Sequence, residues 1–346
     1  MTTGDVLLVG SVPRESAREV FQICSSELEH HLQALPDGEV GPRKSWIQCQ
    51  ALLVFHQHPA IETIRRPPTT DGLAVSYLDN WIFRLKPGTN VIQFDDLKYA
   101  GWAVESYRLF AEMRKQGAIP DGLRFQVSLP TPLGGCVTFF DQPQDLERVY
   151  RGYVPAMMRE IEKICAQIPA QDLAIQWDVC VEILEIATKH GLLEGDPLAR
   201  AAASFEQLGK SVPSSAMLGY HLCYGDLGHR HLVEPDSLSL SVDMANLAVA
   251  HSGRRVDWVH MPVPVNRRDD NYFAPLRDLT IGDTKLYLGL IHRQDSVEGA
   301  LARAAIARQH LPRFGVATEC GLGRRDPETL TEVLRLHREV AERLSK

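Results

Sequence analysis

The sequence predicts one (β/α)8 barrel over residues 1–346, and three observations lead to this prediction. Short apolar, β-branched runs alternate with longer stretches of helical periodicity, a pattern typical of a parallel sheet covered by helices. The short runs number eight, which suits closure of the sheet into a barrel. The chain length also falls within the range of such barrels. An open, doubly wound sheet is the alternative that the same alternation allows.

Each expected strand is an apolar run that ends in a turn or in polar residues. The eight strands are expected at 6–10, 32–35, 123–129, 173–178, 217–223, 256–261, 286–291 and 314–319. Helical patterns cover 15–29, 144–167, 198–209, 238–252, 297–309 and 327–344. The last helix opens with Asp326-Pro327-Glu328, which supplies an N-cap candidate, proline at the first helical position and an acidic first turn.

Residues 40–122 interrupt this alternation and are interpreted as an insertion after the second strand. The stretch is rich in aromatic residues, and Lys86-Pro87-Gly88 indicates a hairpin turn. An insertion that follows a barrel strand lies on the face where such enzymes place their active sites. The insertion is therefore either a lid or cap that contacts substrate or an excursion that stabilises the barrel.

Composition and charge limit the expected partners and compartment. A formal net charge of −7 and the lack of a basic run argue against nucleic acid and anionic membranes as partners. The first apolar run is too short for a signal peptide or a membrane span, so we expect a cytoplasmic protein. Seven cysteines at irregular spacing indicate reduced thiols. A small-molecule substrate is expected, and homo-oligomer formation is left open.

Polar residues recur where the expected strands end, and in a barrel these positions converge on one mouth. They are Ser11, Asp37, Glu39, Thr131, Asp178, His221, Cys223, Asp226, His260, His292, Glu319 and Cys320. The convergence predicts an active site there.

Three of these residues form a candidate zinc site. His221 and Cys223 are two positions apart on a strand end, so their side chains point to the same face. Cys320 follows the eighth strand, and a set of two thiolates with one imidazole suits Zn²⁺. His260 is the best candidate for a fourth ligand, with Glu319 behind it. A buried cysteine beside a hydrogen-bonded histidine is the alternative.

Five motifs occur in an order that resembles the C-terminal catalytic domain of cobalamin-independent methionine synthase. They are Gly10-Ser11-Val12-Pro13-Arg14, Asp37-Gly38-Glu39, Ile175-Gln176-Trp177-Asp178, His221-Leu222-Cys223 and Glu319-Cys320-Gly321-Leu322. The wider superfamily, which we term UROD/MetE-like, includes uroporphyrinogen decarboxylase and the epoxyalkane:coenzyme M transferases. The likeness runs from about residue 6 to residue 325, and this chain resembles a stand-alone relative of that domain.

The resemblance implies a zinc site and a substrate site on a barrel. The family's metal-binding histidine and two cysteines match His221, Cys223 and Cys320. The position of the family's acidic metal ligand matches the region of His260 in this sequence, so the acidic ligand is missing or replaced here. The resemblance also implies that Glu39 and Asp178 bind the amino group of the substrate. It implies that the Gly10-Ser11 turn helps to bind the substrate carboxylate.

Several departures concern the substrate. The chain has no counterpart of the family's N-terminal barrel, which puts a folate in doubt. Asp178-Val179-Cys180 stands where the family has Asp-Glu-Pro, and residues 129–134 lack the tryptophan of the family's folate-contacting loop. Neither folate nor homocysteine is therefore assigned.

Our first hypothesis is zinc-dependent transfer of a methyl or other alkyl group to or from a thiol substrate, with an alkyl donor as the second substrate. Asp178 and Glu39 would orient the substrate, and Asp226 would serve as a general acid. His292 is a second candidate for that acid.

Two other hypotheses remain. The first is a metal-free decarboxylase or lyase, in which Arg14, Arg324 or Arg325 holds substrate carboxylates and Asp37 or Asp178 places the reacting atom. The second is a binding protein that keeps the fold without catalysis. The residues expected to bind substrate are Ser11, Arg14, Asp37 and Arg324.

Overall fold

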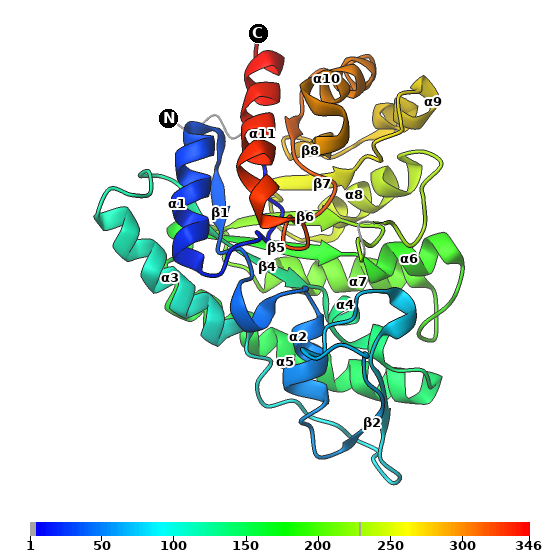
Figure 1. Ribbon diagram of the computed structural model, residues 1–346. Coiled ribbons are helices and arrows are strands. Elements are labelled where there is room, and N and C mark those ends of the chain that lie inside the picture. The colour runs from blue at the N-terminus through cyan, green and yellow to red at the C-terminus, as the bar shows by residue number, and fades with distance from the viewer. Residues whose placement is uncertain (1–4, 228–229) are drawn as a thin grey trace.

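A parallel sheet forms the centre of the protein (Figure 1). The computed structural model describes residues 5–227 and 230–346. The sheet has seven strands, β1 Ala34–Pro36, β4 Arg124–Pro130, β5 Leu173–Val179, β6 Met217–Leu222, β7 Trp258–Pro262, β8 Lys285–Gly289 and β9 Gly315–Val316. Their spatial order follows the chain without a reversal. A doubly wound sheet requires such a reversal, so the barrel-like alternative is the one confirmed.

The first expected strand, 6–10, differs from the other seven. The structure shows no regular strand there, but Val6 forms isolated parallel bridges with Leu32, just before β1, and with Val316 of β9. The Val6 N–H donates to His31 O at 3.1 Å, and the Leu7 N–H donates to Val316 O at 3.0 Å. Both edges of the sheet therefore meet the same segment, which shows that the sheet is curled.

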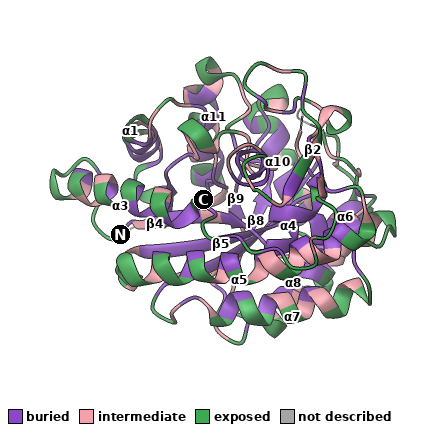
Figure 2. Cartoon of the chain, turned by 90° about the horizontal axis from the view of Figure 1, so that it is seen from below, coloured by how far each residue is buried: buried purple, intermediate pink, exposed green. Residues whose placement is uncertain are grey.

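Helices cover the outside of the sheet, and their exposed faces point away from the buried strands (Figure 2). The main helices are α1 Ala17–Leu28, α3 Tyr99–Lys115, α5 Pro143–Gln167, α6 Val181–Thr188, α7 Pro197–Lys210, α8 Ser239–His251, α10 Ser296–Ala307 and α11 Leu330–Leu344. Short helices are α2 Gln48–Gln50, α4 Pro132–Cys136 and α9 Asp270–Phe273. Among residues 5–227 and 230–346, no helix has both the length and the apolarity needed to cross a membrane.

Helix α1 shows how the local sequence sets this layer. The Ser16 hydroxyl accepts a hydrogen bond from the Glu19 N–H and caps the helix. Val20, Phe21 and Leu28 recur at helical spacing and are fully buried. The buried face packs on β1, and α1 also lies beside α11 (Figure 1).

The segment 40–122 lies between β1 and β4 and has structure of its own. It contains α2, a π-helical turn at Ala51–Phe55, the antiparallel pair β2 Ile61–Arg65 and β3 Ile82–Leu85, and α3. The expected hairpin turn at 86–88 is wrong, because that turn follows β3 and residues 66–81 join the two strands. Helix α3 packs against α1 and α5. Residues 40–98 therefore form the part outside the strand–helix alternation, and their interpretation as an insertion stays a prediction.

Candidate metal and substrate site

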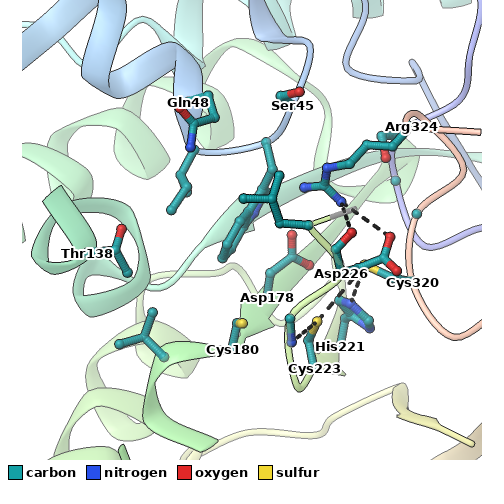
Figure 3. Close-up of a pocket in the computed structure, with 18 of the residues that line it drawn as sticks. Ser45, Gln48, Thr138, Asp178, Cys180, His221, Cys223, Asp226, Cys320 and Arg324 are labelled. Atoms are coloured by element: carbon teal, nitrogen blue, oxygen red, sulfur yellow. Dashed lines mark hydrogen bonds and ion pairs between the residues drawn. The ribbon is translucent and has the colours of Figure 1, made fainter. Parts of the chain in front are cut away.

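A pocket of about 350 Å³ lies at the carboxyl ends of the strands. Eight of the side chains that the sequence nominated line it. They are Ser11, Glu39, Asp178, His221, Cys223, Asp226, Cys320 and Arg324. Figure 3 shows the acidic, thiol and imidazole groups gathered on one side of this pocket.

His221, Cys223 and Cys320 form a cluster whose candidate ligand atoms all lie within 4.8 Å of one another. Cys320 Sγ is 4.0 Å from Cys223 Sγ and 3.7 Å from His221 Nε2. His221 is in β6, and the Cys223 N–H donates to Val179 O at 3.1 Å, which extends the pairing with β5 by one residue. The donor set and its spacing fit a zinc ion held by three protein ligands.

The turn after β9 brings Cys320 to the cluster. A Cβ on Gly321 would lie 2.2 Å from Ser11 Oγ, so only glycine allows the turn to approach the first segment this closely. The Leu322 N–H donates to Ser11 O at 2.7 Å, and the Gly323 N–H donates to Ser11 Oγ at 3.2 Å. Ser11 therefore fixes this turn as well as lining the pocket.

The structure corrects the expectation that His260 is a fourth ligand. Both of its ring nitrogens are engaged, with Nδ1 2.7 Å from His221 Nδ1 and Nε2 3.0 Å from Thr318 O. A carbonyl oxygen can only accept, so the hydrogen of His260 is on Nε2. Burial lowers the pKa of His260 to about 3, which keeps its Nδ1 unprotonated. His260 thus lies behind His221 and outside the cluster.

This contact fixes the tautomer of His221. Because His260 Nδ1 is an acceptor, His221 Nδ1 carries the hydrogen between the two rings. The pKa of His221 is well below its usual value, mainly because the ring is buried and secondly because His260 is close. The lone pair of His221 therefore lies on Nε2, the atom near Cys320 Sγ. Metal-binding histidines commonly have this arrangement, with the second ring nitrogen bonded to an outer group.

A third thiol contacts the cluster. Cys180 lines the same pocket, and its interaction with Cys223 is the main reason why the pKa of Cys223 is well above its usual value. The pKa of Cys320 is raised as well, mainly by its interaction with Cys223 and secondly by burial. Zinc would therefore displace thiol protons on binding. The sequence signal for this thiol is weak, because only its position two residues after Asp178 marks Cys180.

Three carboxyl groups line the same pocket, those of Glu39, Asp178 and Asp226. Gln176 Nε2 donates to Asp178 Oδ1 at 2.9 Å. Burial raises the pKa of Glu39 to about 7. The pKa of Asp178 is well above its usual value, mainly because of burial and secondly because of the charge of Glu39. Asp226 Oδ2 lies 3.4 Å from Arg324 Nη1. The pair Glu39–Asp178 therefore tends to hold a proton at neutral pH.

Two nominated substrate-binding residues are directed elsewhere, and these expectations are corrected. Asp37 Oδ2 binds Arg43 at 2.5 Å, and Asp37 Oδ1 accepts from the Glu39 N–H at 3.1 Å. Arg14 Nη1 donates to Pro13 O at 3.0 Å and to Pro327 O at 2.9 Å. Neither residue lines the pocket. Both side chains stabilise turns next to it.

Residues of the segment 40–98 complete the pocket wall, and the sequence did not single them out. Gln48 Nε2 donates to Asn80 Oδ1 at 3.0 Å, and the Tyr77 hydroxyl accepts from the Leu227 N–H at 3.1 Å. Trp46 lines the pocket as well. The aromatic content of the segment was the available signal, but it did not show which residues face inward.

Replacing Glu39 by glutamine is expected to stabilise the protein at about pH 8 and to change its stability little at about pH 4. The folded-state pKa is raised from 4.5 to about 7, so folding favours the protonated carboxyl. This contribution is fully present below the unfolded pKa and is lost as pH rises through the folded pKa. The gain at high pH should be about 1–2 kcal/mol, measured by urea unfolding. Equal unfolding free energies of variant and native chain at both pH values would contradict it.

Comparisons with known proteins agree with the barrel-like fold. No protein-family profile and no curated sequence matches the chain. A solved structure described as the putative vitamin-B12-independent methionine synthase from Listeria monocytogenes is 14% identical over 97% of this chain and 96% of its own, with a TM-score of 0.56. A B12-independent methionine synthase from Shewanella sp. W3-18-1, in complex with selenomethionine, is 13% identical over 100% and 98%, with a TM-score of 0.61. Identities this low establish similarity of fold.

Proposed function

We propose that this protein is a zinc-dependent enzyme that transfers a methyl or other alkyl group to or from the sulfur of a thiol substrate. The observation that carries this proposal is the cluster of His221, Cys223 and Cys320 within one pocket. The fold similarity to two proteins described as B12-independent methionine synthases supports it. We further propose that residues 6–10 act as the eighth strand and that residues 40–98 act as a cap.

The cluster residues would hold the metal, and the pocket residues would hold the substrates. Zinc, when bound by His221, Cys223 and Cys320, would lower the pKa of a substrate thiol and make its sulfur nucleophilic at neutral pH. His260 holds the His221 ring so that Nε2 is available.

The reaction forms one bond and breaks another. The sulfur of the thiol substrate forms a bond to the alkyl carbon of the donor, and the bond between that carbon and its leaving group breaks. The leaving group takes the electron pair, and the proton from the thiol balances the charge. Asp226, which lies in the pocket beside Arg324, is the proposed group for delivering a proton to the leaving group.

Asp178 and Glu39 are proposed to orient the thiol substrate. When one of the two carboxyl groups is protonated, the two residues can together accept from one substrate group and donate to another. This arrangement suits a hydroxyl or an amino group on the substrate. Ser11 and Arg324 stand on the same wall and would contact a further polar group of the substrate.

The metal-free decarboxylase or lyase is disfavoured by the placement of the arginines. Arg14 binds backbone carbonyls, and Arg325 does not line the pocket. Among the described lining residues, Arg324 is the single arginine or lysine, and it lies close to Asp226. A site for substrates with several carboxylates would need more cationic groups.

A transfer assay with controlled metal content tests the proposal. Purified protein is incubated with mixed aliphatic and aryl thiols and isotopically labelled S-, N- and O-methyl donors, and S-methyl products are detected by mass spectrometry. We expect labelled thioether from the zinc-loaded protein, none after chelation, and recovery when zinc is restored. Transfer by a folded, metal-free protein at the full rate would overturn the zinc-dependent mechanism.

A further inference from the structure

Large apolar and aromatic side chains make up much of the pocket lining. They include Trp46, Ile47, Tyr77, Val181, Leu184 and Leu232. They come from three separate parts of the chain, namely the segment 40–98, helix α6 and the loop after β6. Since three elements contribute, the wall is a built surface of the pocket and not the side of one helix.

Few charged residues line the pocket. Arg324 is the one arginine or lysine among the described lining residues, and its guanidinium lies near Asp226. The acidic residues Glu39 and Asp178 also stand beside the cluster. In Figure 3 Thr138 and Gln48 lie across the pocket from His221 and Cys320. Thr138 and Gln48 are polar but uncharged.

Leu232, which lines the pocket, is also exposed at 47%. Two further exposed apolar side chains are Val75 at 64% and Leu78 at 83%. Val75 and Leu78 flank Tyr77, which bonds to the backbone of Leu227 across the mouth. Exposed apolar surface that continues into a pocket typically marks the binding of an apolar ligand.

We propose that the alkyl-bearing substrate is an uncharged molecule with an apolar alkyl or aryl body. Its reacting atom lies at the cluster, and its body lies against Ile47, Val181 and Leu184. The position of the reacting atom rests on the proposed function, whereas the position of the apolar body does not. A multiply anionic donor such as a folate polyglutamate does not suit this pocket, because the described lining offers a single cation that already faces a carboxylate.

Binding of two matched probes tests this inference. Thioanisole is neutral, and 4-(methylthio)benzoate has the same shape with one added negative charge. Calorimetric titration of zinc-loaded and zinc-free protein is expected to show thioanisole binding at least about tenfold tighter than the benzoate. Equal or tighter binding of the benzoate would overturn the inference.

Two leucine variants locate the binding wall. Leu184→Ala and Leu232→Ala should each weaken thioanisole binding by roughly fivefold to tenfold, since each removes apolar contact area. Leu198→Ala is the matched control, because Leu198 is 45% exposed on α7 and outside the pocket. Leu232 lies on the rim, so its variant is expected to fold like the native chain. Unchanged binding in both pocket variants would overturn the inference.

The zinc-free arm separates this inference from the function on which it rests. If the protein holds no zinc but still binds thioanisole with the expected preference, the proposed transfer chemistry fails and the apolar wall stands. If it holds zinc and transfers methyl groups but prefers the benzoate, the transfer chemistry stands and the assignment of an apolar substrate fails.

Discussion

Replacing Cys320 by alanine is expected to reduce bound zinc from about one ion per chain to less than about one tenth. The cluster offers three protein ligands, and loss of one thiolate leaves an imidazole and a single sulfur. Two protein ligands hold zinc too weakly to retain it through buffer washing. Alkyl transfer should fall with the metal. Zinc content by elemental analysis, read together with the circular dichroism spectrum, measures the effect.

Cys165→Ala is the matched control for this experiment. Cys165 is a half-buried free cysteine on α5 and does not line the pocket. Its variant should keep the full zinc content, which excludes a general effect of cysteine removal. A folded Cys320→Ala protein that retains the native amount of zinc would show that the metal, if bound, lies elsewhere.

Replacing His260 by alanine is expected to weaken zinc binding by about tenfold to a hundredfold while leaving the number of sites unchanged. The His221 Nδ1–H loses its acceptor, so the tautomer with its lone pair on Nε2 is no longer favoured. His260→Gln supplies an amide oxygen near the same place and should restore part of the affinity. Competition with a chromophoric chelator measures the change.

The cobalt-substituted protein distinguishes positioning from ligation. If His260 acts only through His221, the visible spectrum of bound Co²⁺ should be nearly the same in native and His260→Ala protein. A spectrum showing loss of a nitrogen ligand would contradict the assignment. His337→Ala is the control, because His337 is an equally buried histidine bonded to Val333 O and outside the pocket.

Much of the fold could be predicted because it follows from local periodicity. Seven of the eight expected strands are present, and six expected helices correspond to α1, α5, α7, α8, α10 and α11. Helix α6 has eight residues and is too short to show a clear period, and α3 lay within the expected insertion. Val6 pairs through isolated bridges and not through a continuous ladder, which sequence patterns do not reveal.

The candidate site was predictable to the extent that strand ends meet at one face. This rule placed His221, Cys223 and Cys320 together, although they come from two distant parts of the chain. It did not specify which neighbour a side chain would bind. Asp37 is bound by Arg43, and His260 is bound between His221 and Thr318. Such partners depend on three-dimensional packing, which a residue's position after a strand does not determine.

The bridges from Val6 to both sheet edges have a consequence for how the chain reaches its folded form. Val6 meets Leu32 close by in sequence, but it meets Val316 across about 310 residues. During synthesis the first segment can dock on one neighbour early, whereas its other neighbour emerges from the ribosome much later. The last step of assembly is therefore a long-range closure, and such closures are slow. Nascent chains that stop before β9 would leave an open seam that chaperones can recognise.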